Sequence, residues 1–324
     1  MRLLAVTPNW LGDMVMSASL LQGLKAALPS LHITALGPTF ARPLLERLDA
    51  VDQVIESPFG HGGLQWSQRR AFAKTLPAFD AAVVLPNSFK SALIPWMAGI
   101  PKRVGWRGEM RWGVLTHQHK LNKADYPRMV DRYTALAEHF DLPVSHVAPK
   151  MTPQAQIAAS NTIAIAPGAA FGSAKRWPAD RYAQVALRAL ATGHEVALLG
   201  GPGEADDCAA IQAAQPAAYR SKIHNYAGQL SLGESIDTLA GCQAAIANDS
   251  GMMHIAAALG VPLVGVFGPT SPQHTPPLSP KAEVVWSRPS CAPCFQRTCP
   301  LSHHECMQSL QPDTVVQAMN RVMV

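Results

Sequence analysis

The chain carries, at residues 245–270, the sequence AIANDSGMMHIAAALGVPLVGVFGPT. The apolar run at 244–247 is long enough for a short buried strand, and a second such run covers 263–267. Between them, residues 252–259 form an apolar helical segment that Gly260 and Pro262 are expected to end. The pattern therefore predicts a strand, a polar turn, a helix and a second strand of a parallel sheet.

The polar turn is Asn248-Asp249-Ser250-Gly251, and it places unpaired N–H groups and the positive end of a helix dipole at one point. Such a point suits an anion, for example a diphosphate. Asp249 repels phosphate, so its carboxylate is expected to cap the helix, as Ser250 also can, or to accept from a hydroxyl. His254 follows Ser250 by one helical turn and faces the same side. The alternative is that Asp249 and Ser250 only cap a core helix and that His254 is a buried, hydrogen-bonded histidine.

Length and composition indicate a two-domain globular protein: the 324 residues are 48% hydrophobic and 15% charged. The net charge of +5 and the pI near 8.9 fit an acidic ligand or a membrane surface better than nucleic acid. No apolar run approaches the roughly 18 residues that span a bilayer. The first residues lack the pattern of a signal peptide. We therefore expect a cytoplasmic protein without a transmembrane segment, and six mostly reduced cysteines.

Other sheet-edge loops repeat the arrangement of strand, polar turn and helix. The first is PNWLGD at residues 8–13, which ends on Asp13 at the start of a helix. This loop lacks the Gly-x-Gly-x-x-Gly pattern of dinucleotide binding, which disfavours an oxidoreductase. From the residues alone, Asp13 is an N-cap or a carboxylate at the mouth of the sheet.

A second loop, PGAAFGSAKRWP at residues 167–178, follows a predicted strand at 162–166. Its small residues allow close approach of the backbone to a ligand, and Lys175 supplies a cation. The alternative is a surface lysine. A further loop, GGPGE at 200–204, also follows an apolar run. The alternation of strands and helices predicts parallel sheets with right-handed crossovers.

Basic residues concentrate between Lys102 and Arg132, with Trp106 and Trp112 among them. A nucleic-acid surface and an ordinary solvated face are both compatible with this pattern.

Four cysteines lie close together near the C-terminus: Cys291, Cys294, Cys299 and Cys306. Their spacing invites a structural zinc interpretation, but it lacks the two well-separated pairs that are usual for such sites. Reduced thiols, a disulfide and zinc remain open.

Taken together, these motifs resemble those of the lipopolysaccharide heptosyltransferases, glycosyltransferase family 9. The resemblance covers nearly the whole chain and rests on four segments: NWLGD at 9–13, PGAAFGSAKRWP at 167–178, the AGQLSL segment at 227–232, and NDSGMMH at 248–254 with GVFGPT at 265–270. The second segment departs from the family pattern at Ala170, where Glu is expected, and at Ser173, where Pro is expected. Because Ala170 has no carboxylate, it cannot perform the role of that Glu in this chain.

The resemblance implies an α/β fold of the GT-B type, with two Rossmann-like domains facing a central cleft. The expected domains are an acceptor-side domain at 1–150, a donor domain at 160–311, and a C-terminal helix at 312–324 that crosses back to the first domain. It implies that Asp13 is the catalytic base. The implied donor-binding residues are Lys175, Glu204, Leu230, Asp249, Ser250, Gly251 and His254. Acceptor-side contacts are expected from Lys90, Arg103, Arg107 and Lys120.

The implied reaction is inverting transfer of L-glycero-D-manno-heptose from ADP-heptose to the first heptose of the lipopolysaccharide inner core. No Asp-x-Asp occurs in the chain, so no metal and no cofactor are expected. The expected partners are ADP-heptose and a phosphorylated lipid A–core acceptor, met at the cytoplasmic face of the inner membrane, with no nucleic acid. The alternatives are addition of the first heptose, another reaction of family 9, and a nucleotide-binding module without catalysis.

Overall fold

The computed structural model describes residues 1–60, 62–144, 147–155 and 160–324. The chain divides into two compact units, Met1–Lys150 and Met151–Val324. Pro149 and Pro153 predict a linker at residues 148–159, which spans this division; its residues 156–159 lie outside the described residues.

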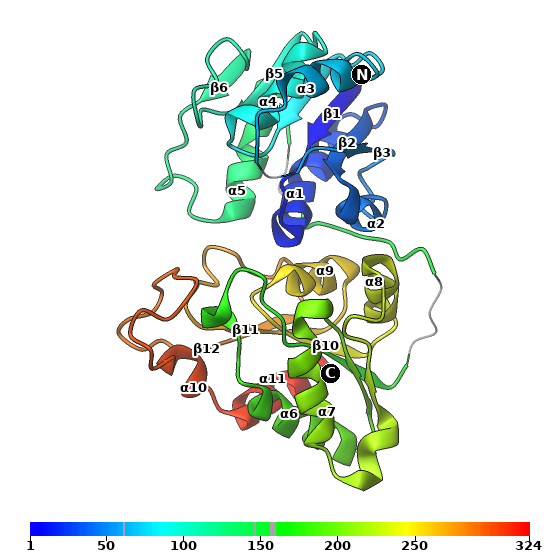
Figure 1. Ribbon diagram of the computed structural model, residues 1–324, viewed down its shortest axis with the longest axis vertical. Coiled ribbons are helices and arrows are strands. Elements are labelled where there is room, and N and C mark those ends of the chain that lie inside the picture. Colours follow the sequence, from blue (N-terminus) through cyan, green and yellow to red (C-terminus); the bar gives the residue numbers. More distant parts are fainter. Residues whose placement is uncertain (61, 145–146, 156–159) are drawn as a thin grey trace. The chain divides into compact units, whose positions relative to one another are not determined.

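Unit 1 is built on a parallel sheet with the strand order β3-β2-β1-β4-β5-β6 (Figure 1). Its strands are β1 (Arg2–Val6), β2 (His32–Pro38), β3 (Gln53–Ser57), β4 (Ala81–Val84), β5 (Lys102–Trp106) and β6 (His117–His119). Its helices are α1 (Leu11–Ala27), α2 (Arg42–Leu45), α3 (Trp66–Ala73), α4 (Phe89–Met97) and α5 (Met129–Thr134), with 3-10 turns at Thr39–Ala41 and Ala135–Phe140.

Unit 2 repeats the same topology, with the strand order β12-β11-β10-β7-β8-β9. Its strands are β7 (Thr162–Ala166), β8 (Glu195–Leu198), β9 (Ile223–Asn225), β10 (Ala244–Asn248), β11 (Leu263–Phe267) and β12 (Ala282–Trp286). Its helices are α6 (Ala179–Ala191), α7 (Ala205–Ala213), α8 (Leu232–Ala240), α9 (Gly251–Leu259), α10 (Glu305–Gln308) and α11 (Pro312–Val322). Short 3-10 turns lie at Ser173–Lys175, Pro202–Glu204 and Ala217–Lys222.

The predicted α/β fold class is confirmed, because both sheets are parallel and both follow the doubly wound order of Rossmann-like domains. In each sheet the order reverses beside the first strand of the unit, between β1 and β4 and between β7 and β10. Loops that leave these strands at their carboxyl ends therefore diverge to opposite faces, and a crevice remains between them.

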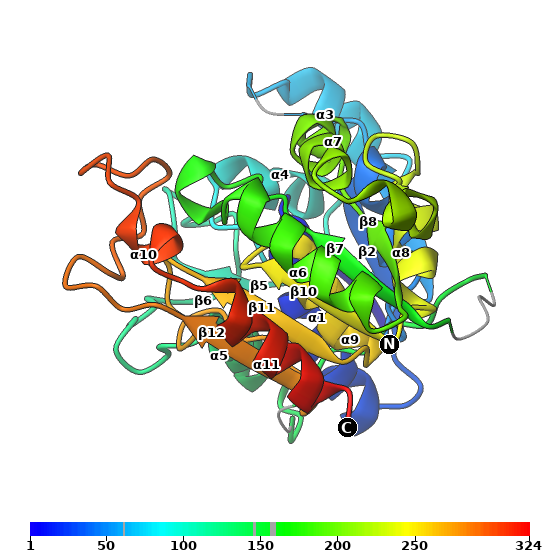
Figure 2. The same ribbon diagram turned by 90° about the horizontal axis from the view of Figure 1, so that it is seen from below.

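The final helix, α11, packs on elements of its own unit. α11 runs alongside β11 and β12 and also packs on α6, as Figure 2 shows. Val315, Ala318 and Met319 are buried in the hydrophobic core of unit 2. This apolar face requires cover, and the sheet of its own unit provides it.

Two local features of unit 1 differ from what their sequence predicts. The sequence of residues 40–47 predicts one helix, but the structure has a 3-10 turn followed by the short α2. The sequence of residues 64–76 also predicts a helix with Arg69 exposed. Arg69 is only 5% exposed, because its guanidinium stacks 4.4 Å from the Phe59 ring centroid and Nε donates to the Leu64 carbonyl. No helix among the described residues has both the length and the apolar character needed to cross a membrane.

A buried arginine fixes the loop that follows β5. Arg111 has no exposed surface, and it donates to the carbonyl of Pro86 at 2.8 Å and to the carbonyl of Trp106. These bonds tie the end of β5 to the loop that leaves β4. Burial lowers the pKa of Arg111 to about 10, but the side chain remains charged at neutral pH.

We expect Arg111→Met to lower the free energy of unfolding by about 3 kcal/mol, because two buried carbonyls lose their donor. Urea unfolding of the purified protein measures this. Arg107→Met, at an exposed neighbouring position, is the matched control and is expected to change stability by no more than about 0.5 kcal/mol. Equal stabilities of the two variants contradict the structural role of Arg111.

Candidate functional site

The switch point of unit 2 is held together by Asn248, the last residue of β10. Asn248 is fully buried, accepts from the Tyr182 hydroxyl at 2.8 Å, and donates to the Pro167 carbonyl at 2.5 Å. Because Pro167 begins the loop after β7, this one amide fixes the spacing between the two loops that flank the switch point.

Asp249 forms the centre of a buried polar cluster. Its Oδ2 lies 2.6 Å from Lys175 Nζ and 2.6 Å from the hydroxyl of Thr270, and its Oδ1 accepts from Thr275 at 3.3 Å. The Asp249 side chain is 4% exposed and that of Lys175 is 12% exposed. The alternative of a solvent-facing surface lysine is therefore excluded for Lys175. The Asp249 carboxylate accepts hydrogen bonds from the hydroxyls of Thr270 and Thr275, and accepting from a hydroxyl is one of the two roles that the sequence predicts for it.

The prediction that Asp249 or Ser250 caps α9 is wrong. Ser250 occupies the N-cap position, but its side chain makes no cap hydrogen bond to the helix. Asp249 is drawn away by Lys175 and Thr270, whose bonds are charge-assisted and therefore stronger than a cap. Within the described residues, the Ser250 hydroxyl is buried and has no hydrogen-bond partner. The helix start, where Gly251 is the first residue of α9, thus keeps N–H groups that an anion can use.

His254 is buried beside this cluster, with 4% of its surface exposed. Burial lowers its pKa to about 4, which the negative charge of Asp249 partly opposes and the positive charge of Lys175 reinforces. The imidazole is therefore neutral at neutral pH and contributes no net charge to the site.

The other predicted donor residues follow the ends of β8 and β9, at the same edge of the sheet. Glu204 accepts from the Gly201 N–H at 2.9 Å. A Cβ at Gly168 would lie 2.6 Å from Glu204 Cγ, so the loop after β7 and the loop after β8 are in close contact. Leu230 is partly exposed in the loop after β9. The structure thus brings all seven predicted donor residues to the carboxyl edge of one sheet.

Unit 1 has a cavity of about 640 Å³ at its own switch point. Asp13 lines it from the first turn of α1, and the Tyr133 hydroxyl donates to Asp13 Oδ1 at 3.1 Å. Burial raises the pKa of Tyr133 well above its ordinary value, and the charge of Asp13 adds to this. The phenol therefore stays protonated and orients the carboxylate at any physiological pH. The N-cap of α1 is Trp10, so Asp13 is not an N-cap residue.

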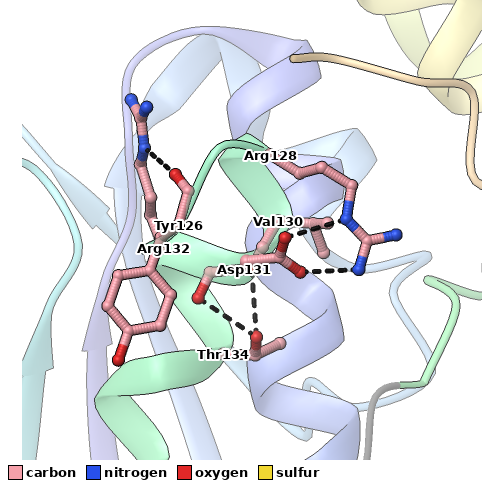
Figure 3. A network of polar contacts seen from close by, with 6 residues as sticks. All are labelled: Tyr126, Arg128, Val130, Asp131, Arg132 and Thr134. Atoms are coloured by element: carbon pink, nitrogen blue, oxygen red, sulfur yellow. Dashed lines mark hydrogen bonds and ion pairs between the residues drawn. The ribbon is translucent and has the colours of Figure 1, made fainter. Parts of the chain in front are cut away.

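Tyr133 lies on α5, whose start is fixed by its own polar contacts, shown in Figure 3. Arg128 makes two hydrogen bonds of 2.8 Å to Asp131, and Arg132 Nε donates to the Tyr126 carbonyl at 2.9 Å. These contacts hold the first turns of the short helix that presents Tyr133 to Asp13.

Of the four predicted acceptor-side residues, only Lys90 lines the cavity. The Arg103 guanidinium donates to the carbonyls of Val114 and Ile100, so it is used to hold the chain. Arg107 and Lys120 are exposed and do not contribute to the cavity wall. The positively charged side chains that line the cavity are Arg69, Lys90, Lys123 and Arg132. Lys123 and Arg132 belong to the basic segment between Lys102 and Arg132, whose pattern does not distinguish them from its other cations, and Arg69 lies outside that segment.

The four clustered cysteines are free thiols. Backbone N–H groups of residues 301–304 lower the pKa of the Cys299 thiol, whereas burial raises that of Cys306 to about 11. Among the described residues, no group of three or more His, Cys, Asp or Glu side chains is arranged to hold a metal ion.

Comparison with known proteins places these features in context. Residues 69–305 match the model of glycosyltransferase family 9 (heptosyltransferase). Lipopolysaccharide heptosyltransferase 2 of Escherichia coli (strain K12) is 38% identical, over 100% of this chain and 99% of that protein. Lipopolysaccharide heptosyltransferase 2 of Salmonella typhimurium (strain LT2) is 42% identical over 88% of each chain. The solved structure of E. coli ADP-heptose lps heptosyltransferase II superposes with a TM-score of 0.88 and 36% identity, covering 100% of this chain and 98% of that one.

The neutral, buried His254 makes stability depend on pH. The unfolded histidine titrates near 6.5 and the folded one near 4, so the unfolded state binds a proton first. We expect the free energy of unfolding to fall as the pH falls from about 6.5 towards about 4, and His254→Gln to reduce that loss. Urea unfolding at several pH values measures it. His303→Gln, an exposed control, is expected to retain the full loss. An unchanged acid dependence in His254→Gln contradicts the assignment.

Proposed function

This chain belongs to glycosyltransferase family 9, and we propose that it transfers L-glycero-D-manno-heptose from ADP-heptose to the first heptose of the lipopolysaccharide inner core, as a heptosyltransferase of the second type. The similarity to heptosyltransferase 2 proteins along the whole chain supports the choice of donor and acceptor. The single observation that carries the chemistry is the position of Asp13, held by Tyr133 inside a cation-lined cavity.

The proposed reaction is a direct displacement. Asp13 accepts the proton of the acceptor hydroxyl as that oxygen attacks the anomeric carbon of the donor. The new C–O bond forms on the face opposite the diphosphate, the bond to ADP breaks, and the configuration inverts. ADP leaves with the bonding electron pair, and the proton remains on Asp13 until solvent removes it.

Unit 2 is proposed to bind the donor. The N–H groups at the start of α9 and the Ser250 hydroxyl point to a site for the diphosphate, with Lys175 beside it. Glu204 is proposed to accept from the ribose hydroxyls, and Leu230 to pack on the adenine. His254 packs against the Asp249–Lys175 pair as a neutral group. This scheme needs no metal ion.

Unit 1 is proposed to bind the acceptor, a phosphorylated lipid A–core molecule at the cytoplasmic face of the inner membrane. Lys90, Lys123 and Arg132 line the same cavity as Asp13, and a surplus of cations suits an anionic saccharide. Arg103 is not part of this proposal, because it does not line the cavity and its guanidinium holds the carbonyls of Val114 and Ile100.

The test is release of ADP from ADP-heptose by the purified protein, with and without a truncated core acceptor that ends on its first heptose. Acceptor-dependent release in the presence of EDTA is expected. Release that requires an acceptor ending before the first heptose indicates the first-heptose reaction instead. ADP binding without turnover on either acceptor indicates a nucleotide-binding module. Loss of activity in EDTA that Mg²⁺ restores contradicts the metal-independent scheme.

We expect Asp13→Asn to lower the turnover number by at least about a hundredfold, because it removes the base but keeps the size of the side chain. The affinity for ADP is expected to stay unchanged, since Asp13 acts on the acceptor. Rapid-quench turnover and calorimetric titration with ADP measure the two quantities. Turnover close to that of the unmodified protein, or a parallel loss of ADP affinity, contradicts this role.

A further inference from the structure

Lys175 is not a surplus positive charge. Its ammonium group lies 2.6 Å from the Asp249 carboxylate, and the pair has no net charge. His254, buried beside it, is neutral at neutral pH. A diphosphate leaving group carries more than one negative charge, so the polar cluster around Asp249 does not balance it. Another cation is needed close to Lys175.

The cysteine-rich segment places an arginine at this point. Arg297 lies between Cys294 and Cys299, and its carbonyl accepts from the Ala174 N–H at 3.0 Å, one residue before Lys175. The contact is so close that a Cβ at Gly172 would lie 2.2 Å from the Arg297 oxygen. Phe295 N–H donates to the Pro269 carbonyl at 2.8 Å, next to Thr270. The segment therefore braces the loop after β7 against the loop after β11.

The two cations share one aromatic ring. Arg297 Cζ lies 5.2 Å from the centroid of Phe171, and Lys175 Nζ lies 4.9 Å from the same centroid. A ring attracts a cation through its quadrupole without cancelling the charge. Phe171 thus holds Arg297 near Lys175 while leaving its full positive charge in place.

The charge of Arg297 is not neutralised in the described part of the chain. Lys175 pairs with Asp249, and Arg176 pairs with Asp207 at 3.4 Å. Arg297 is exposed and makes no ion pair with a carboxylate among the residues described. Its guanidinium therefore provides the surplus positive charge at this edge of the sheet.

We propose that Arg297 is a donor-binding residue that makes charge-assisted hydrogen bonds to the diphosphate of the nucleotide sugar and of the departing ADP. This rests on the proposed donor site in unit 2. The planar guanidinium suits two phosphate oxygens at once, and it compensates charge that the Lys175–Asp249 pair leaves uncompensated. In this arrangement the cysteine-rich segment positions a ligand-binding side chain.

The test compares ADP with adenosine, which lacks the diphosphate, by calorimetric titration. Arg297→Gln is expected to weaken ADP binding about tenfold or more and to leave adenosine binding unchanged. Its melting temperature is expected to stay the same, because the Ala174 bond uses the backbone of residue 297. Arg297→Lys keeps the charge without the fork and is expected to recover part of the affinity. High salt is expected to narrow the difference between unmodified protein and Arg297→Gln.

Arg288→Gln is the matched control. Arg288 is an exposed arginine of the same region that stacks 4.8 Å from the Trp286 ring centroid, and its loss is expected to leave ADP affinity unchanged. ADP binding by Arg297→Gln equal to that of the unmodified protein overturns the inference while the donor site stands. Equal weakening of ADP and adenosine also overturns it, since that result indicates a structural role. If the unmodified protein binds neither ligand, the proposed donor site is wrong and the inference with it.

Discussion

The reversal of strand order in each sheet is the constraint on which the rest of the structure depends. At β1 and β4, and again at β7 and β10, neighbouring strands send their following segments to opposite faces. Backbone groups at these points have no neighbouring helix to cover them, and side chains from distant parts of the sequence meet there. Asp13 and Lys90 meet in this way in unit 1, and Lys175 and Asp249 in unit 2. The strand order alone therefore predicts where in each unit the candidate site residues gather.

Within unit 2, the buried Lys175–Asp249 pair determines what the surrounding groups are free to do. Removing two charges from water is costly, and the attraction between them offsets that cost only with further hydrogen bonds, here from Thr270 and Thr275. With Asp249 engaged, the start of α9 loses the cap that the sequence pattern predicts. Because Asp249 neutralises Lys175, the proposed uncompensated positive charge at this edge of the sheet is that of Arg297. A single salt bridge therefore accounts both for the uncapped helix and for the need for a second cation.

The sequence predicts well those features that depend on local pattern. The bounds of β7 and β11 agree with their apolar runs, and Gly260 ends α9 with a φ of +73°, as a helix-stopping glycine should. The residues that the resemblance predicts for the donor lie at one edge of one sheet, because each follows a strand of that sheet. What the sequence does not predict are contacts between distant segments. The resemblance implies an acceptor contact for Arg103, and the sequence assigns no buried role to Arg69 or Arg111. In the structure each of the three donates to backbone carbonyls. Arg297 gives no signal of its own, because its neighbour Phe171 lies more than a hundred residues earlier.

Within the described residues the buried Ser250 hydroxyl has no hydrogen-bond partner, so a ligand that bonds to it lowers the free energy of the site. A buried hydroxyl without a partner costs about 1–3 kcal/mol, and native proteins keep few such groups. The N-cap residue of α9 makes no side-chain cap, and Arg297 has no carboxylate partner in the part of the chain that the structure describes. Each of these deficits is relieved by the same kind of ligand, one that accepts hydrogen bonds and carries negative charge. At the proposed donor site one diphosphate relieves all three deficits, so little of its binding energy is spent on rearranging the protein.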